Sequence, residues 1–452
     1  MLLLTDGRVL VHEDAYPRWD TLVPDSHGSY VRGHWHRAAS LPSHYSPEYF
    51  ASAVLPSGHV IVIGGEYDGG PAQVETKRGA IYDPRANRWR KLAAPSGWEG
   101  VGDAQSTLLP DGRLLVANIF DSTAALLNPR TLGWTPTGFG KADSNTEEGF
   151  ALLPDGRVLT VDSYDRGSEL FDPATGTWSS AGTVPTDLVD KGLEQGPLVS
   201  GPDGSVFVVG AAGHTAIYHS VPNAVGRWTV GPDLPVIGGD QYGAADAAGA
   251  RLPNGDVLLD ASPGDYNAPV HFWRFDGKHL KQLEDAPGAG DSSGYSTRML
   301  VLPTGDILYD DGVKIFVFRS HSRPRRSWRP RIRTVPRRLV RGHTYTLAGV
   351  QLAGRDQGAA YGDDFQDSTN YPLVRFEQPK HRRVSYARTF GWSSVSTAPN
   401  ASSTTKFTVS RHAPLGRSRI VVVANGIGSR PVQVRVLARR PPRHRRGHVR
   451  PL

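Results

Sequence analysis

One polar position recurs in this chain just before a series of short apolar runs. Counting seven residues back from the residue before each of six Gly-ending turns gives Tyr49, Asp103, Glu147, Gln195, Asp246 and Ser296, and their polar neighbours include Glu48, Gln105, Glu148, Glu194, Tyr295 and Arg298. If the runs converge on one axis, the carboxylates share an acidic pocket, raise one another's pKa and attract cations or sugar hydroxyls. The alternative is that each position is polar only because water covers the start of a strand.

The apolar runs belong to a repeat with a period near fifty residues. Seven times a run breaks at a two-residue turn and resumes, at Asp6-Gly7, Ser57-Gly58, Asp111-Gly112, Asp155-Gly156, Asp203-Gly204, Asn254-Gly255 and Thr304-Gly305. Successive turn glycines are 51, 54, 44, 48, 51 and 50 residues apart. A fixed period with a hairpin signature in each unit predicts stacked repeats of one small sheet.

Each repeat has four strand-like parts. In the second unit these are residues 51–55, residues 60–63, residues 79–84 and a last part that contains Trp89. The third part ends at a proline, which cannot donate to a ladder, and the recurring Trp is expected to pack between neighbouring units. Four antiparallel strands in each of seven units predict an all-β, seven-bladed β-propeller with a ligand site at its axial mouth.

The pattern changes after an Arg-rich segment. Residues 343–351, 373–384, 404–409 and 419–424 alternate like strands, which predicts an immunoglobulin-like β-sandwich. We therefore expect a propeller over residues 1–325, a sandwich over residues 326–437 and a disordered basic tail over residues 438–452. Because residues 2–4 already form the innermost strand of the first blade, the closing strand must follow residue 320 or be missing. We expect the first blade to be truncated by the loss of an upstream segment.

Composition excludes several kinds of chemistry. The chain has no Cys, so it forms no disulfide, Cys-ligated zinc site or reactive thiol. No apolar run approaches the roughly 20 residues of a membrane helix. The sequence as given begins without a signal peptide, and a secreted or cell-surface protein is expected if its N-terminus is truncated.

Arginine is concentrated in two segments. Residues 319–341 hold ten Arg and no acid, residues 435–452 hold seven more and no acid, and the remainder has 34 basic against 44 acidic residues. The first segment is either a binding site for an anionic polymer, such as nucleic acid or cell-wall phosphate, or a solvated crossing segment that connects two domains. We favour the crossing and expect no nucleic-acid partner, because the acidic propeller repels polyanions.

Several segments resemble the copper-radical oxidases of the galactose oxidase and glyoxal oxidase type. They are residues 49–58 (Tyr-Phe-Ala-Ser-Ala-Val-Leu-Pro-Ser-Gly), residues 64–70 (Gly-Gly-Glu-Tyr-Asp-Gly-Gly), residues 357–364, residues 370–372 and residues 423–427. The resemblance covers nearly the whole chain. It implies a kelch-type seven-bladed propeller followed by an early-set domain.

The resemblance also implies a copper site of two tyrosines and two histidines, in which one tyrosine is thioether-linked to a cysteine. Tyr49 stands at the position of the cross-linked tyrosine, Tyr295 at that of the axial tyrosine and Tyr67 at that of the aromatic residue stacked above the cross-link. One of the two histidine positions holds Ser296. The segment expected to supply the other histidine is residues 386–389, and Phe-Gly-Trp follows it in place of a histidine. The position of the cysteine falls before residue 1. Copper(II) prefers nitrogen ligands, so two phenols alone give neither affinity nor square geometry.

We therefore expect a galactose-oxidase-like propeller that has lost copper-ligand histidines and uses no cofactor. We interpret it as a binding module for a carbohydrate or similar polyhydroxyl ligand, held at the axial mouth by Tyr49, Tyr67, Asp103, Glu147, Glu194, Asp246, Tyr295 and Arg298. Two enzymatic alternatives stay open. One is a copper-radical oxidase of primary alcohols or aldehydes that uses Tyr49 and Tyr295; the other is a metal-independent hydrolase or lyase with paired carboxylates such as Asp103 and Glu147. The identity of the ligand and the oligomeric state stay open as well.

Overall fold

The chain is built from β-strands. The computed structural model describes residues 1–362 and 367–439, in which there is no α-helix. It has four three-residue 3-10 helices, η1 (Ala289–Asp291), η2 (Gly294–Ser296), η3 (Arg326–Trp328) and η4 (Pro379–His381). The predicted all-β class is confirmed, whereas residues 440–452, which make up most of the predicted basic tail, lie outside the described residues. In the described ranges no helix has the length and apolar character that a membrane crossing requires.

Seven sheets follow one another along residues 2–318. Sheet 1 contains β1 (Leu2–Leu3), β2 (Val9–His12), β3 (Trp19–Val23) and β4 (His34–Arg37), and sheet 2 contains β6 (Ala51–Val54), β7 (Val60–Ile63), β9 (Gly79–Asp83) and β10 (Arg88–Leu92). Sheet 3 contains β11 (Ser106–Leu108), β12 (Leu114–Ala117), β13 (Ala124–Leu127) and β14 (Trp134–Pro136), and sheet 4 contains β15 (Ala151–Leu152), β16 (Val158–Val161), β17 (Ser168–Asp172) and β18 (Thr177–Ser180). Sheet 5 contains β19 (Leu198–Ser200), β20 (Ser205–Val209), β21 (Thr215–Val221) and β22 (Ala224–Val230).

The last two sheets depart from the four-stranded pattern. Sheet 6 contains β25 (Ala248–Arg251), β26 (Val257–Pro263), β27 (His271–Phe275) and β28 (Leu280–Gln282), and it also takes in β23 (Val236–Ile237), β24 (Asp240–Gly243) and the late strand β35 (Ala359–Tyr361). Sheet 7 has three strands among the described residues, β29 (Arg298–Val301), β30 (Ile307–Asp310) and β31 (Ile315–Phe318). The short strands β5 (Pro47–Glu48) and β8 (Tyr67–Asp68) pair with each other beside sheet 2.

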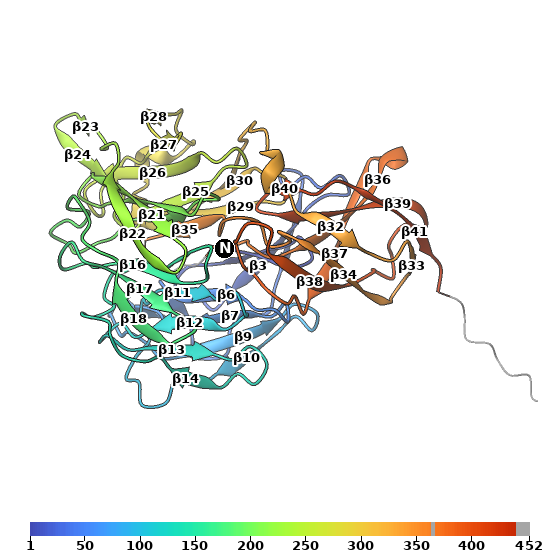
Figure 1. Cartoon of the computed structure of the whole chain (residues 1–452), viewed down its shortest axis with the longest axis horizontal. Helices are drawn as coiled ribbons and strands as arrows, with labels where there is room; N and C mark the ends of the chain where they lie inside the picture. The colour runs from blue at the N-terminus through green and yellow to red at the C-terminus, as the bar shows by residue number, and fades with distance from the viewer. Residues whose placement is uncertain (363–366, 440–452) are drawn as a thin grey trace, which may run out of the picture.

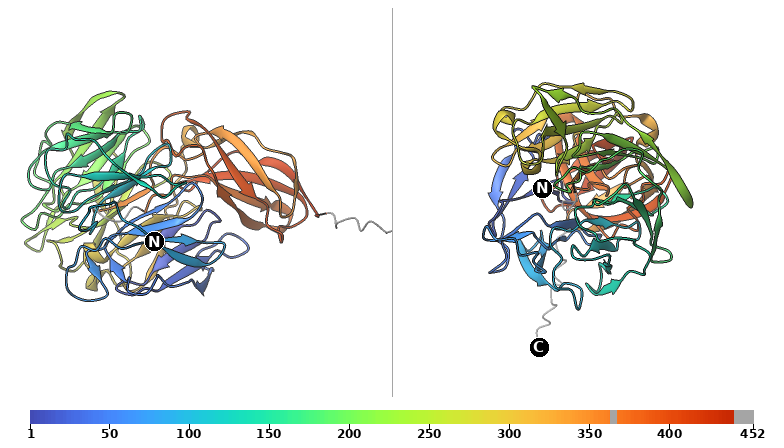
Figure 2. Two further views of the ribbon diagram at one scale, coloured as in Figure 1. Left: turned by 90° about the horizontal axis from the view of Figure 1, so that it is seen from below. Right: turned by 90° about the vertical axis from the view of Figure 1, so that its left-hand side faces the viewer.

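The seven sheets are arranged in a ring. The colour sequence runs around it from blue through green to yellow in the right-hand view of Figure 2. The first strands of successive sheets contact one another from β1 to β29. Sheets 1 and 7 also share one apolar core, which contains Leu2, Leu3, Leu300 and Leu302. Packing of buried Leu side chains therefore joins the two ends of the series.

All seven predicted turns are formed. The second residue of each turn has φ between 79° and 100°, a left-handed conformation that glycine adopts without a steric penalty. These residues are Gly7, Gly58, Gly112, Gly156, Gly204, Gly255 and Gly305. The amide of each donates to a carbonyl three residues earlier, as in Gly112 to Leu109 at 2.9 Å. The turn residues predicted from sequence are thus confirmed by the backbone.

Three tryptophans of the outer strands link neighbouring sheets, as expected. The indole N–H of Trp89 donates to the Ala39 carbonyl (2.9 Å), that of Trp134 to the Ala93 carbonyl (2.7 Å) and that of Trp228 to the Ser168 hydroxyl (2.9 Å). In each pair the acceptor belongs to the preceding sheet or follows its last strand. Each large ring therefore buries apolar area between two sheets while its polar atom stays satisfied.

Residues 331–437 form a nine-stranded sheet beside the ring (Figure 1). Its strands are β32 (Arg331–Thr334), β33 (Arg338–Val340), β34 (Thr344–Val350), β36 (Leu373–Gln378), β37 (Arg383–Phe390), β38 (Ser402–Thr408), β39 (Gly416–Ala424), β40 (Ile427–Gly428) and β41 (Val432–Leu437). The order is β32-β34-β38-β37-β36-β39-β41-β33, with β40 paired to β39. The single strand expected over residues 373–384 is wrong: η4 separates β36 from β37, because Pro379 begins a turn and cannot donate to a ladder.

The C-terminal sheet and the segment that leads into it contact the face of the ring that carries the turns. Gly7 lies against Tyr386, and Gly255 lies against Trp328. The Gly391 amide donates to the Pro56 carbonyl at 2.5 Å. Since the inner strands start at the other end, the predicted polar positions open on the uncovered face.

One C-terminal segment passes into the ring itself. β35 pairs with β25 in antiparallel register, Ala248 opposite Tyr361 and Ala250 opposite Ala359. Just before it, Gln357 is 6% exposed and bonds three sheets: its Oε1 accepts from the Leu152 amide (2.6 Å), its Nε2 donates to Thr107 Oγ1 (2.9 Å) and its amide donates to Ser200 Oγ (3.0 Å). One C-terminal segment is therefore hydrogen-bonded to the inner strands of sheets 3, 4, 5 and 6.

The turn glycines provide a stability test. A Cβ at Gly112 (φ 88°) would lie 2.6 Å from Pro56 Cγ, whereas a Cβ at Gly97 (φ 86°) would meet no atom within 4 Å. We expect Gly112→Ala to lower the free energy of unfolding by about 2 kcal/mol and Gly97→Ala by about 1 kcal/mol. Urea denaturation followed by circular dichroism measures both, and equal losses would contradict the packing described for this turn.

Candidate functional site

Three of the predicted polar positions have a strained backbone. Tyr49, Glu147 and Asp246 precede β6, β15 and β25, and their φ angles are 49°, 54° and 43°. A left-handed conformation costs a residue with a side chain about 1–3 kcal/mol and clusters at functional sites. The same position carries this cost in sheets 2, 4 and 6, which indicates that the direction of these side chains matters.

Tyr49 belongs to an aromatic group that surrounds one cation. The rings of Tyr49 and Tyr67 pack edge to face with their centroids 6.3 Å apart. The guanidinium carbon of Arg298 lies 5.7 Å from the Tyr49 centroid and 3.7 Å from the centroid of Tyr361 in β35. Arg298 is 8% exposed, so its positive charge is held between two aromatic rings, those of Tyr49 and Tyr361.

Tyr295 connects this aromatic group to sheet 6. Its carbonyl accepts from the Tyr361 hydroxyl (2.8 Å) and from Arg298 Nη1 (2.7 Å), which holds η2 in place. Its ring packs edge to face on Tyr266 with centroids 5.2 Å apart. The Tyr266 hydroxyl in turn donates to Glu194 Oε1 at 2.8 Å. A continuous series of contacts therefore runs from Tyr49 to Glu194.

Glu147, Glu194 and Asp246 form a carboxylate trio from sheets 4, 5 and 6. One ligand oxygen of each lies within 4.8 Å of those of the other two. Glu194 is 7% exposed, and within the described residues its Oε2 has no hydrogen-bond partner. Carboxylates this close repel one another, so the trio favours ligands that bring hydroxyl donors or positive charge.

Two neighbours of the trio have raised pKa values. Burial, followed by the hydrogen bond and charge of Asp190 and the charge of Glu194, raises the pKa of Asp265 to about 7. Burial and the charge of Glu194 raise the pKa of Tyr266 well above its usual value. The Tyr266 phenol therefore stays a donor to Glu194, and Asp265 is a second proton source at the same side of the mouth.

The carboxylate trio contains fewer residues than the sequence pattern predicts for the acidic pocket. Asp103 is not a member of the trio, and its amide donates to Glu75 Oε2 at 3.3 Å. Gln195 is buried, and its Nε2 donates to the Asp162 carbonyl at 3.0 Å. Three of the predicted carboxylates thus come together. Asp103, the predicted residue of sheet 3, instead contacts Glu75.

A second carboxylate group surrounds its own cation. Asp143, Glu148 and Asp162 each place an oxygen within 4.8 Å of the others. Lys141 Nζ lies 2.5 Å from Asp143, 2.8 Å from Glu148 and 2.8 Å from Glu169. Burial alone would lower the pKa of Lys141, but these carboxylates raise it above its usual value. This group is a buried ion-pair network with a structural role.

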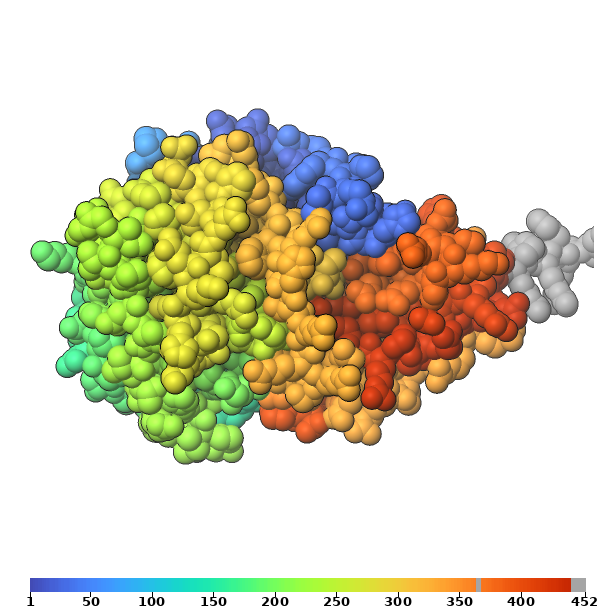
Figure 3. Space-filling view, turned by 90° about the horizontal axis from the view of Figure 1, so that it is seen from above, coloured from blue at the N-terminus to red at the C-terminus, as the bar shows by residue number. Residues whose placement is uncertain are grey.

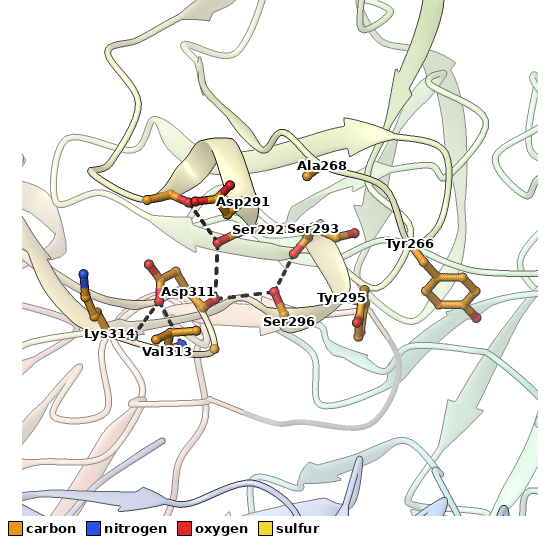
Figure 4. A pocket seen from close by; sticks show the side chains of 12 residues that line it. Tyr266, Ala268, Asp291, Ser292, Ser293, Tyr295, Ser296, Asp311, Val313 and Lys314 are labelled. Carbon is orange, nitrogen blue, oxygen red and sulfur yellow. Dashed lines mark hydrogen bonds between the residues drawn. The ribbon is translucent and has the colours of Figure 1, made fainter. Parts of the chain in front are cut away.

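Two cavities open beside Tyr295. One, of about 240 Å³, is lined by Met1, His12, Asp14, Glu48, Tyr49, Tyr295, Ser296, Arg298, Asp310 and Gly312. The other, of about 370 Å³, is shown in Figure 4. Tyr266 and Tyr295 lie at one end of it, and the hydrogen-bonded group of Ser292, Ser293, Ser296 and Asp311 lies at the other. Tyr295 is therefore the shared wall of both cavities.

The positions expected to hold copper-ligating histidines lie apart. Ser296 Oγ donates to the Ser293 carbonyl at 2.8 Å. The segment 386–389 lies on the turn face, where the Thr389 amide donates to the Thr5 carbonyl at 3.1 Å. His12 is the imidazole beside Tyr49; burial lowers its pKa to about 3, and its Nε2 lies 2.7 Å from the Tyr16 carbonyl.

Sequence reasoning missed Tyr266, Asp265 and Tyr361. Tyr266 and Asp265 follow β26, so a search confined to the residues before each inner strand passes over them. Tyr361 lies in a segment noted only for its family resemblance, and the pairing that brings it to the axis spans 113 residues, from Ala248 to Tyr361. An aromatic residue after the second strand of sheet 6 was the available signal for Tyr266.

The structure is similar to solved structures at low sequence identity. A fungal alcohol oxidase of the AA5 family, in complex with copper, has a TM-score of 0.56 and 12% identity over 96% of each chain. An inactive variant of virginiamycin B lyase from Staphylococcus aureus, with quinupristin, has a TM-score of 0.45 and 9% identity over 80% of this chain and 94% of the other. No family model matches the chain, and no curated protein matches it either. The first likeness shows an all-β, propeller-like fold.

The raised pKa of Asp265 predicts a pH effect on stability. Because its folded pKa of about 7 exceeds the unfolded value, the folded state binds more protons, and the stability this provides at low pH is lost as the pH rises toward 7. Between pH 4 and pH 7, which are about the unfolded and folded pKa values of Asp265, we expect the denaturation midpoint to fall less steeply in Asp265→Asn than in wild type. The control Asp187→Asn removes a carboxylate that is 78% exposed. Equal slopes for wild type and Asp265→Asn would contradict the assignment.

Proposed function

We propose that the axial mouth binds a carbohydrate or similar polyhydroxyl ligand and that it does so without copper. The observation that carries the proposal is the row Tyr67, Tyr49, Tyr295 and Tyr266, which flanks two cavities and ends at the carboxylate trio. Aromatic faces pack against the C–H faces of a sugar, and carboxylates accept hydrogen bonds from its hydroxyls. The Tyr266 ring, 64% exposed, is accessible to such a ligand.

The proposal includes a reading of the architecture. We take sheets 1 to 7 as the seven blades of one kelch-type propeller over residues 1–325, and the nine-stranded sheet as an immunoglobulin-like early-set domain over residues 326–437. This reading is supported by the ring of sheets and by the seven equivalent turns. Rigid inner strands would then fix the spacing of the mouth residues, which favours a preorganised site.

The donor set argues against a copper centre of the family type. Tyr49 and Tyr295 have the Arg298 guanidinium in contact with them, and a fixed cation disfavours a metal cation at the same place. The His12 ring already meets a carbonyl through Nε2, and Ser296 bonds to a backbone carbonyl. These residues do not provide the nitrogen-rich square set that copper(II) prefers.

A hydrolase or lyase acting on the same ligand is the second candidate. Its supporting observation is that Asp265 lies close enough to Glu194 for the Glu194 charge to help raise the pKa of Asp265 to about 7. A carboxyl group with a pKa near the working pH can donate or accept a proton during catalysis. The candidate predicts release of reducing sugar or unsaturated product from a bound glycan, whereas a pure binding module leaves the glycan intact.

Glycan-array screening followed by calorimetry tests the binding proposal. We expect Tyr49→Ala and Tyr266→Ala each to weaken binding of the best saccharide about tenfold or more, because each removes a stacking surface. The control is Trp35→Ala, which removes an exposed ring from the outer strand of sheet 1. Absence of saccharide binding, or an equal loss in the control, would overturn the proposal.

Metal analysis tests the absence of copper. After reconstitution with copper(II), we expect the protein to hold no stoichiometric copper and to release no peroxide from primary alcohols or aldehydes. The same preparation of Arg298→Ala tests whether the cation is what excludes the metal. Stoichiometric copper in the wild-type protein, lost in Tyr49→Phe, would establish the oxidase alternative.

A further inference from the structure

A row of three arginines crosses the C-terminal sheet far from the axial mouth. Arg338 of β33 lies opposite Arg435 of β41, and Arg435 lies opposite Arg417 of β39. All three are exposed, and their neighbours along the strands, Leu339, Val436 and Ser418, are buried. Adjacent strands are about 4.8 Å apart, so the side chains form a row about 10 Å across on one face.

The row has no counter-charge in the described part of the chain. None of the three guanidinium groups makes an ion pair or a side-chain hydrogen bond there. Residues 326–439 hold 20 Lys and Arg against five Asp and Glu. Of the acids described in that range, Asp356 and Asp367 are buried, and Glu377 is paired with Arg375 at 2.8 Å.

Folding alone does not account for this arrangement. Like charges directly opposite each other on neighbouring strands destabilise a sheet, and here two such pairs share Arg435. The face is also open: the three arginines are exposed, and Figure 3 shows part of the red C-terminal segment at the surface of the molecule. A ligand with closely spaced oxyanions would remove the repulsion, because each guanidinium can bind a carboxylate or sulfate through two N–H groups.

The surroundings of the row favour a polysaccharide over a nucleic acid. The outward positions next to it are Gln433, Arg419 and Glu377, which share the same face by register. None of these three paired positions holds an aromatic residue on which a base could stack, the usual anchor for single strands. The row lies on a β-sheet rather than on a helix or two-stranded ribbon that enters a duplex groove. The Gln433 amide, in contrast, suits sugar hydroxyls.

We propose that Arg338, Arg417 and Arg435 form a binding surface for an anionic polysaccharide, one that bears carboxylate or sulfate groups. The surface lies on the C-terminal sheet and is independent of the ligand proposed for the axial mouth. It gives a role to part of the Arg-rich segment, residues 319–341, that the mouth does not use.

The test compares two triple variants of the full chain. One is Arg338→Gln, Arg417→Gln and Arg435→Gln; the other, Arg90→Gln, Arg130→Gln and Arg227→Gln, removes the same charge from exposed positions on three sheets of the ring. Affinity for polygalacturonate, dextran sulfate, neutral dextran and a thymidine oligonucleotide is measured by biolayer interferometry at two salt concentrations. Polygalacturonate and dextran sulfate distinguish carboxylate from sulfate as the recognised group.

We expect the row variant to lose about tenfold or more in affinity for at least one anionic polysaccharide at low salt, and the ring variant to stay within about twofold. The row variant is also expected to melt at a higher temperature than wild type at low salt, because the repulsion is gone. Equal losses in both variants, no binding to either anionic polysaccharide, or tighter binding to the oligonucleotide than to both would overturn the proposal.

Discussion

The pairing of β35 with β25 is the contact on which the arrangement of the axis depends. An inner strand of a ring of sheets leaves one row of backbone N–H and C=O groups unpaired, and in sheet 6 a strand from the C-terminal half satisfies them. The same segment carries Gln357, which bonds sheets 3, 4 and 5, and Tyr361, which supports Arg298 and Tyr295. The C-terminal half therefore builds the floor of a mouth whose walls come from the ring.

That floor separates two electrostatic environments within one mouth. On the side of sheets 1, 2 and 7, Arg298 is held by aromatic rings and a carbonyl. On the side of sheets 4, 5 and 6, Glu147, Glu194 and Asp246 concentrate negative charge. Tyr295 and Tyr266 lie between them and present rings rather than charges. A neutral ligand with many hydroxyls can meet both sides, whereas a metal cation would be repelled by the first.

The repeat was predictable from sequence because its signals are local. A Gly-ending turn needs only two residues, and all seven glycines have the left-handed backbone that such turns require. The positions of Tyr49, Glu147 and Asp246 before their strands were predictable too, because each lies seven residues before the residue that precedes a turn. Contacts between distant segments were not predictable: nothing near Ala359–Tyr361 indicates a partner in β25, and Tyr266 reaches Glu194 from 72 residues away. The break at Pro379 is visible in the sequence, but the alternation of residues 373–384 predicts a single continuous strand there.

The central claim is that one polyhydroxyl ligand lies across the aromatic row without a metal. A crystal structure of the protein grown with copper(II) and the best saccharide, with anomalous data at the copper edge, tests it most directly. The account predicts sugar density between Tyr49 and Tyr266, hydroxyl contacts to Glu194, and no anomalous peak beside Tyr295. A copper peak bound by Tyr49 and Tyr295, or a saccharide bound elsewhere with the mouth empty, would contradict it.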